Sequence, residues 1–395
     1  MPVKRQVQLV TERPHEWSTI ASIILSDSKA KSAGIKEIAR ALGISIGTVD
    51  RALHGRPGVS PKTLSKVLRT AESLNYKPNL AARNLKLNRT LRIAVHLPQE
   101  IASFFDSLRD GIHAAARNSH GLNLQLDFRT FPRLGDGDVE LLEKDIGRDY
   151  DGVIVTPGDP VTIDPLIRRL AQQGAAVVCV ANDAPRTDRI AGISVDATAS
   201  GGIAAELLAR TIKENAFVAT ITGNLSTLDH AEKLRGFAAT LATFAPHLTL
   251  IPAIESHERP KEAYQATLAL LHHSPRPAGL YISTANSLPV LRALEEKKLL
   301  NQVQIITTDL FADLISLVES GKILATLYQR PFTQGKLAFE ALIRFLLDGV
   351  RPDASVRLAP HIVLRSNLPL FLKHIHQNGT DRSAGNPTNR LHAKV

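Results

Sequence analysis

Polar side chains follow several short apolar runs of this chain, at the places where strands would end. They are Asn182 and Asp183 after 177–180, Thr284 and Asn286 after 279–282, Asp309 after 303–307, and Gln329 after 325–328. Ligands of open parallel sheets bind at the carboxyl ends of the strands. Carboxylates there can accept hydrogen bonds from neighbouring hydroxyls, and amides can both accept and donate. The spacing therefore predicts a site for a small hydroxylated ligand, with a turn role as the alternative for Asp183.

Patterns that would indicate catalysis or a metal are weak in this sequence. Asp136, Asp138 and Glu140 alternate oxygen ligands, but their loop lacks the full spacing of a calcium site. His272 and His273 have no partner at zinc spacing. No Gly-rich phosphate cradle, nucleophile elbow or paired catalytic motif is visible, so we expect no catalytic residue, metal or cofactor.

From residue 91 onward, strand-like apolar runs alternate with amphipathic helical stretches. The strand candidates are Leu91–Leu97, Leu122–Phe128, Gly152–Val155, Val177–Val180, Phe217–Ile221, Leu248–Ile254, Gly279–Ile282, Val303–Thr307 and Ala325–Tyr328. Helical stretches include Phe105–Asn118, Ala199–Lys213, His230–Ala245 and Pro331–Leu347. Such alternation predicts parallel sheets covered by helices. So many strands favour two α/β lobes over a single sheet.

A different pattern precedes these lobes. Apolar residues at 35, 38, 39 and 42 mark one buried helix face, and Gly43 follows where a helix end needs positive φ. Ser45 is placed to cap a second short helix, and Ser60 with Pro61 begins a third. Two short helices joined by a tight turn are typical of a helix-turn-helix, whose second helix enters the major groove of DNA.

Charge also favours contact with nucleic acid. Residues 34–92 hold twelve lysines and arginines against three acidic residues, a formal +9, and the whole chain carries +10. A basic domain ahead of a near-neutral body is the electrostatic pattern of a phosphate-backbone binder. The alternative, a merely solvated surface, does not explain why the charge coincides with three predicted helices.

Length and composition limit the remaining possibilities. A chain of 395 residues is expected to form two or three domains. The single cysteine, Cys179, lies in an apolar run, which predicts a buried structural thiol and no disulfide framework. No run reaches membrane-spanning length and no secretory signal is visible, so a cytoplasmic protein without membrane contact is expected. Residues 1–33 and 373–395 are expected to be a flexible N-terminal extension and a flexible tail.

Four segments, Ile35–Ala39, Gly43–Leu53, Val59–Thr63 and Leu74–Asn79, together resemble the DNA-binding domain of the lactose-repressor (LacI/GalR) family of bacterial transcription regulators. The body looks like the two-lobed sugar-binding domain that this family shares with periplasmic binding proteins. The resemblance covers residues 34 to about 372. It implies a small all-α helix-turn-helix domain at 34–78 and a hinge helix and linker at 79–90. A two-lobed α/β effector-binding and dimerisation domain with parallel sheets would follow at 91–372.

The resemblance also implies a set of DNA contacts. The residues are Ser45, Ile46, Gly47, Thr48, Asp50, Arg51, His54, Ser60, Lys62, Thr63, Asn79, Ala82, Arg83 and Leu85. Those that open the second helix, from Ile46 to Arg51, would meet bases or phosphates. Phosphates would be contacted by Ser45, Ser60, Lys62 and Thr63. Leu85 would wedge into the minor groove from a hinge helix that folds on operator DNA. The expected partner is a pseudo-palindromic double-stranded operator held by a homodimer.

For the cleft between the lobes, the resemblance implies a monosaccharide or polyol effector that changes operator affinity. The predicted effector-binding residues are Phe104, Phe105, Asn182, Asp183, His230, Thr284, Asn286, Asp309 and Gln329. Phe104 and Phe105 would stack on a sugar face, and Asp309 with Gln329 would bind its hydroxyls. The alternative for one of the two phenylalanines is a place in the lobe core.

Two positions depart from the family's pattern. The family usually has Ser where this chain has Asp50, so an operator different from those of better-known members is expected. Sugar-binding relatives commonly carry an Arg shortly before the Gly-Phe of the second lobe's helix, here Gly236 and Phe237. No Arg occupies that place, and His230 is the expected substitute.

Two other functions remain as alternatives on the same α/β body. A transport-type sugar-binding protein is disfavoured by the DNA-binding segment and the missing signal peptide. A sugar-modifying enzyme would need a catalytic constellation that the sequence does not show. The sequence therefore predicts a transcriptional regulator, with repression favoured, and not an enzyme.

Overall fold

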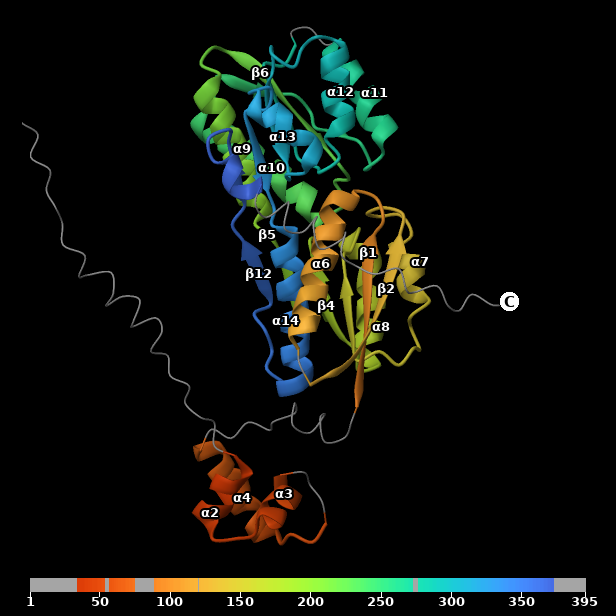
Figure 1. Ribbon diagram of the computed structural model, residues 1–395, viewed down its shortest axis with the longest axis vertical. Helices are drawn as coiled ribbons and strands as arrows, with labels where there is room; N and C mark the ends of the chain where they lie inside the picture. Colours follow the sequence, from red (N-terminus) through yellow and green to blue (C-terminus); the bar gives the residue numbers. More distant parts are fainter. Residues whose placement is uncertain (1–33, 54–56, 75–88, 120, 273–275, 373–395) are drawn as a thin grey trace, which may run out of the picture. The chain divides into compact units, whose positions relative to one another are not determined.

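The computed structural model describes residues 34–53, 57–74, 89–119, 121–272 and 276–372. The chain divides into two compact units, Met1–Asn79 and Leu80–Val395, which are both drawn in Figure 1. The predicted N-terminal extension at 1–33, the predicted hinge helix within 79–87 and the predicted tail at 373–395 lie outside the described residues.

The described part of the first unit consists of three short helices. They are α2 (Ile35–Leu42), α3 (Ile46–Leu53) and α4 (Pro61–Ser73). Gly43 ends α2 at φ 62°, as predicted, and its N–H reaches the carbonyls of Ala39 and Arg40. Ser60 accepts a hydrogen bond from the Thr63 N–H (3.2 Å) at the start of α4. The helices share one small core, formed by Ile38, Ala39, Val49, Ala52, Val67 and Ala71.

The first lobe of the second unit is built on a parallel sheet of strand order β12-β5-β4-β3-β1-β2. Its strands are β1 (Thr90–Pro98), β2 (Asn123–Phe131), β3 (Gly152–Val155), β4 (Ala176–Val180), β5 (Ala191–Val195) and β12 (Ser355–Leu358). Its helices are α6 (Ala102–Asn118), α7 (Asp138–Glu143), α8 (Pro160–Gln172) and α14 (Pro331–Asp348). Two separate apolar clusters pack against this sheet, because its central strands are buried on both faces.

The second lobe repeats this plan with a sheet of order β13-β11-β10-β9-β6-β7, in which β8 also pairs with β6. Its strands are β6 (Ala216–Thr222), β7 (Leu248–Leu250), β8 (Ile254–Glu255), β9 (Gly279–Ile282), β10 (Gln304–Thr308), β11 (Ala325–Tyr328) and β13 (His361–Val363). Its helices are α9 (Ala197–Thr211), α10 (Leu228–Phe244), α11 (Pro260–Leu271), α12 (Leu288–Glu296) and α13 (Ala312–Glu319). Only β13 runs antiparallel, beside β11, among the described pairings. The expected two α/β lobes with parallel sheets are thus confirmed.

Three short connections join the lobes within the described chain. β5 leads into α9, β11 leads into α14, and β12 leads to β13. Figure 1 shows α14 in the lower lobe and α9 in the upper lobe, on either side of these connections. Arg330, in the second connection, has φ 61°, which a non-glycine residue rarely adopts. Short segments of this kind are where rotation between lobes is absorbed.

Helices α6 and α14 lie side by side because each has a glycine at the contact (Figure 1). A Cβ on Gly111 would lie 2.0 Å from the carbonyl oxygen of Phe332. One on Gly335 would lie 2.1 Å from the carbonyl oxygen of Leu108. Only glycine permits so close an approach of two backbones. The first turn of α6, which carries Phe104, is therefore held by a tightly packed helix pair.

The predicted strands need two corrections. The predicted strand Leu248–Ile254 is wrong, because it is two strands, β7 and β8, with Pro252 between them. Proline cannot donate to the ladder and interrupts it. The strands β5, β12 and β13 were also missed, the last two being short edge strands.

Other expectations from composition can be compared with the structure directly. Cys179 is fully buried, and burial raises the pKa of its thiol to about 12, as expected of a structural cysteine. Among the described residues, no helix is both long and apolar enough to cross a bilayer.

Candidate functional site

Helix α3 presents an exposed polar face on the first unit. Ser45 accepts a hydrogen bond from the Thr48 N–H (3.0 Å), so it caps the helix as predicted. Ser45, Gly47 and Arg51 are exposed, and Ile46 is 51% exposed although its side chain is apolar. A second helix whose first residues, Ile46 and Gly47, are exposed has the arrangement that contact with base edges requires.

The remaining predicted DNA contacts divide into two groups. Ser60 and Lys62 are exposed at the start of α4, while Thr48, Asp50 and Thr63 are half-buried beside them or on α3. The other five lie outside the described residues, namely His54, Asn79, Ala82, Arg83 and Leu85. The described members thus lie at the start of α3 and along it, and in the first turn of α4.

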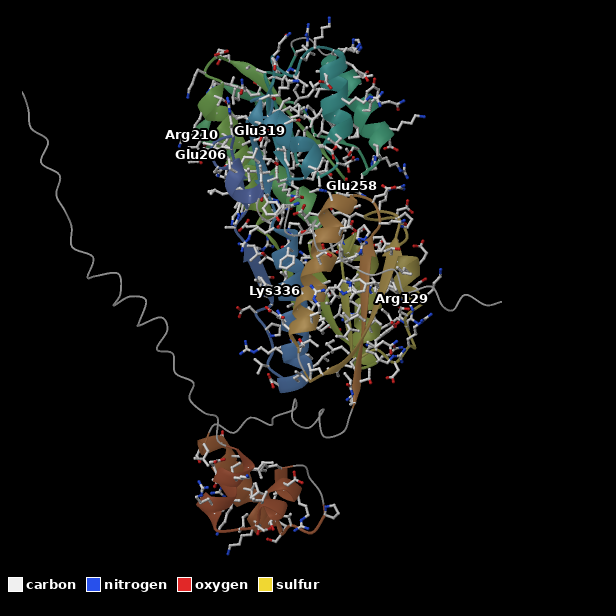
Figure 2. All side chains as sticks on the ribbon, in the orientation of Figure 1. Arg129, Glu206, Arg210, Glu258, Glu319 and Lys336 are labelled. Carbon is white, nitrogen blue, oxygen red and sulfur yellow. The ribbon has the colours of Figure 1, made fainter. Side chains whose placement is uncertain are left out.

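In the second unit, residues of both lobes line a small, partly open cavity of about 40 Å³. From the first lobe it is lined by Ile101, Phe104, Phe105, Leu134, Thr156, Ala181 and Asn182. From the second lobe it is lined by Asp229, His230, Lys233, Glu258, Thr284, Ala285 and Gln329. Figure 2 shows Glu258 at the level where the two lobes meet. The polar groups that converge on this cavity beside an aromatic pair are of the kind that orient a small molecule.

The wall from the first lobe is mainly apolar and aromatic. Phe104 and Phe105 follow Ile101, whose φ of 57° begins α6. Their ring centroids are 4.9 Å apart in an edge-to-face pair, and both side chains also belong to the lobe's core. Both residues therefore belong to the lobe core and also line the cavity, and their stacking on a sugar stays a prediction.

Asn182 connects the walls of the two lobes. Its Nδ2 donates to the carbonyl oxygens of Pro157 (2.6 Å) and Gly158 (3.0 Å), which fixes the amide in the first lobe. Its Oδ1 accepts from the Asp229 N–H (3.0 Å) at the start of α10 in the second lobe. A second link joins Arg357 on β12 to Glu232 on α10, with Nη1 and Oε2 2.6 Å apart. These bonds hold the lobes together on the side of α10.

A chain of buried polar groups crosses the wall from the second lobe. Lys233 Nζ donates to Asp229 Oδ2 (2.6 Å) and to Gln329 Oε1 (2.9 Å). Burial alone would lower the pKa of Lys233, but the nearby carboxylates, Asp229 first, raise it above its ordinary value. Lys233 is therefore a charged lysine although its side chain is only 1% exposed.

Asp309 stands behind Gln329 and positions it. Asp309 accepts from the Gln329 backbone N–H (3.0 Å) with one oxygen and from Gln329 Nε2 (2.6 Å) with the other. Burial raises the pKa of Asp309 to about 6, although the hydrogen bonds from Gln329 oppose this shift. The amide of Gln329 is thereby oriented with its oxygen toward Lys233.

His230 and Glu258 form the other polar corner of the cavity. His230 Nε2 lies 3.3 Å from Glu258 Oε1, and both side chains are almost completely buried. Thr284 Oγ1 lies 2.9 and 2.7 Å from the two Glu258 oxygens. Glu258 has φ 55° and its neighbour His257 has φ 49°, so two consecutive non-glycine residues are left-handed.

Six of the nine predicted effector-binding residues line the cavity, and three do not. The six are Phe104, Phe105, Asn182, His230, Thr284 and Gln329. Asp183 is instead bound to Arg189 and to the Ala184 N–H (2.8 Å), so its predicted ligand role is corrected to a structural one. Asn286 follows Thr284 without reaching the cavity lining, and Asp309 acts through Gln329.

Sequence reasoning missed three charged residues of the cavity, namely Asp229, Lys233 and Glu258. Lys233 could have been predicted, because it lies three residues before Gly236, in the stretch where sugar-binding relatives commonly carry an Arg. Both Lys233 and His230 line the cavity, although His230 alone was predicted to replace the Arg. Glu258 had no such signal, since only its left-handed backbone brings a loop residue to the cavity.

Both units of the chain resemble domains of known proteins. A model of the bacterial regulatory proteins of the lacI family matches residues 34–79, and a periplasmic binding protein domain matches residues 93–349. Catabolite control protein A of Priestia megaterium is 25% identical over 331 residues, covering 83% of this chain and 96% of that protein. The transcriptional repressor PurR of Vibrio parahaemolyticus is 24% identical over 344 residues, covering 85% and 98%.

Solved structures resemble the second unit in fold. A solute-binding protein from Burkholderia graminis in complex with D-arabinose has a TM-score of 0.64 at 22% identity, covering 70% of this chain and 96% of that one. Another from Bacillus halodurans with bound myo-inositol has a TM-score of 0.63 at 16% identity, covering 71% and 96%. Together with the two family models, this fold defines a DNA-binding regulator with a periplasmic-binding-protein-like body.

The chain belongs to the LacI family of bacterial regulatory proteins. It is a transcriptional regulator that binds DNA through residues 34–79 and carries a periplasmic-binding-protein-like domain for a small ligand.

Proposed function

We propose that this protein is a repressor that binds a pseudo-palindromic operator as a homodimer and is controlled by a monosaccharide or polyol in the inter-lobe cavity. The observation that carries the proposal is the joint presence of a helix-turn-helix whose second helix, α3, has exposed residues and of a polar and aromatic cavity between two connected lobes. Because its target is operator DNA, the protein would act in the cytoplasm. The relatives are regulators, and the proposal includes no catalysis.

Coupling between the two functions would use the connections between the lobes. Gln329, which lines the cavity, lies in the connection between β11 and α14. A ligand that binds both walls favours the closed arrangement over an open one, and the hinge region transmits this preference. Such a change alters operator affinity only if ligand and DNA are reciprocally coupled, typically by about 1–3 kcal/mol.

The DNA-binding part of the proposal is tested by two substitutions in the first unit. Arg51→Ala should abolish preference for the protein's own upstream DNA over random DNA, because Arg51 is exposed on the recognition helix. Lys62→Ala should weaken binding to the upstream DNA and to random DNA alike. It should also reduce the slope of log affinity against log salt by about one. Fluorescence anisotropy at several salt concentrations measures both effects.

Arg292→Ala is the matched control, since Arg292 is exposed on α12 in the second unit. It should leave DNA affinity and its salt slope unchanged. If Arg51→Ala retains full preference for the upstream DNA, α3 is not the recognition helix and the proposal fails.

A further inference from the structure

Glu258 is a buried carboxylate of the cavity that lacks a full positive partner. It is 2% exposed, and the Thr284 hydroxyl, with one hydrogen to give, lies within bonding distance of both its oxygens. In the described part of the chain, His230 is the only basic side chain at ion-pair distance from it. The charge state of His230 therefore decides whether Glu258 is neutralised.

The contacts of His230 assign it a neutral ring. The backbone N–H of Asn224 points at His230 Nδ1 at 3.0 Å, and the Asn224 carbonyl oxygen lies farther from it, at 3.2 Å. An N–H can only donate, so the shorter contact makes Nδ1 an acceptor. The Thr227 hydroxyl lies 2.9 Å from the same nitrogen and is within donating distance of the Asn224 carbonyl (2.7 Å). The ring proton then resides on Nε2, facing Glu258. A neutral donor satisfies a hydrogen bond without cancelling the charge.

The only lysine of the cavity lining is already paired. Lys233 is bound to Asp229 and Gln329, with the Asp309 carboxyl behind them. The charged groups that line the cavity are thus two carboxylates and one ammonium, which leaves one negative charge. A buried carboxylate without a compensating charge costs free energy, so a ligand that brings a positive charge is favoured.

Two further polar atoms of the cavity have no hydrogen-bond partner among the described residues. Asp229 Oδ1 and Thr156 Oγ1 are buried and find no hydrogen-bond partner among the residues that the structure describes. Thr156 is fully buried and lines the cavity from the first lobe. Buried polar atoms are normally satisfied, so both atoms are suited to groups of a ligand. The carboxylate oxygen can only accept, which again favours a donor-rich ligand.

The backbone around Glu258 is held in an arrangement that local preference does not favour. His257 and Glu258 both have left-handed φ, and a Cβ on Gly223 would lie 1.9 Å from Glu258 Oε1. Strained positions of this kind persist where surrounding structure imposes them, and they gather at ligand sites. The carboxylate is thus kept in the cavity at a cost to stability.

We propose that the effector carries a protonated amino group beside its hydroxyls, as an amino sugar or an amino polyol does, and that Glu258 binds this group. The inference rests on the proposed function of the cavity as a polyol site and narrows its ligand class. The ammonium group binds between Glu258 and Asp229 Oδ1, and Phe104 and Phe105 cover the apolar face of the ring. A sugar phosphate would add negative charge beside Glu258 and is excluded.

The first test uses the protein without ligand and compares Glu258→Gln with Glu319→Gln. Glutamine keeps the hydrogen bonds to Thr284 and His230 but removes the charge, so Glu258→Gln should raise the melting temperature by about 2–4 °C. Glu319 is exposed on α13, and its substitution should change nothing (Figure 2). A fall in the melting temperature of Glu258→Gln would mean that the charge is already compensated within the protein, which overturns the inference.

The second test titrates the wild type and Glu258→Gln with glucosamine, galactosamine and mannosamine, with their hydroxyl parents, and with the 6-phosphates, at neutral pH by calorimetry. One amine should bind the wild type at least about ten-fold more tightly than its parent, and Glu258→Gln should remove most of that preference. Equal affinity for an amine and its parent overturns the inference while the polyol site stands. Tightest binding of a phosphate overturns it as well. If no compound binds, the polyol site is in doubt and the melting comparison decides about Glu258.

Discussion

The two walls of the inter-lobe cavity are built in different ways. The wall from the first lobe is mostly apolar, and its aromatic pair, Phe104 and Phe105, is at the same time part of the lobe's core. The wall from the second lobe is charged, and its groups form a buried chain from Asp229 through Lys233 to Gln329. Apolar packing supplies affinity that is insensitive to detail, whereas buried charges reject ligands that leave them unpaired. We infer that the second lobe selects the ligand and the first lobe holds it.

The largest expected effect comes from breaking the chain of charges. Lys233→Met should lower the free energy of unfolding by about 3–5 kcal/mol, because it leaves the Asp229 carboxylate buried without a cation. Urea unfolding followed by circular dichroism measures the loss. Lys336→Met is the control, since the Lys336 side chain on α14 is 44% exposed and the substitution should matter little (Figure 2). Equal stability of Lys233→Met and the wild type would show that the charged wall is not a coupled network.

A smaller effect is expected in the apolar wall. Phe104→Leu should lower the free energy of unfolding by about 1–2 kcal/mol and weaken every bound sugar by a similar factor, because the aromatic face is lost to all of them. Calorimetric titration of two sugars into each variant measures this. Phe244→Leu, at a phenylalanine that is 70% exposed, should be neutral. If Phe104→Leu changed the preference between ligands, the inference that only the second lobe selects the ligand would be wrong.

The smallest expected effect is a pH dependence that arises from Asp309. Its pKa is about 6 in the folded protein and near its ordinary value of about 4 when unfolded. The protonated form is therefore favoured by folding, and its contribution is present at low pH and lost as the pH rises through 6. Between pH 5 and 7 the wild type should lose about 1 kcal/mol of unfolding free energy relative to Asp309→Asn.

Chemical denaturation at the two pH values measures this difference. Asp313→Asn serves as the control, because Asp313 is exposed on α13 and should give the same difference from the wild type at both pH values. If the unfolding free energies of Asp309→Asn and the wild type differed by the same amount at both pH values, Asp309 would be shown to remain ionised throughout this range.

Prediction from sequence succeeded where a local pattern determines the structure. The cap at Ser45 and the left-handed Gly43 were predictable, because both depend on a few neighbouring residues. Buried central strands such as Gly152–Val155 were equally clear from their apolar runs. Pro252 shows that one missed breaker is enough to merge two strands into one prediction.

Prediction was weaker where the cavity depends on contacts between distant segments. Asp183 ends a strand as a ligand residue would, yet Arg189 binds it, and the sequence pattern did not reveal this pairing. Glu258 lies in a loop between β8 and α11 and reaches the cavity only through its left-handed backbone. Strand-end rules therefore found the two amides and the Thr284 hydroxyl of the site. They missed the Thr156 hydroxyl and two carboxylates, Asp229 and Glu258.

The most direct test of the account is the affinity of the purified protein for its own upstream DNA, at fixed salt, with and without each sugar and amino sugar. We predict specific binding that one cavity ligand changes by at least about five-fold, and we predict that Glu258→Gln loses the response to that ligand while keeping its DNA affinity. The account would be contradicted if a compound bound in the cavity without changing operator affinity. It would also be contradicted if the protein showed no preference for the upstream DNA under any of these conditions.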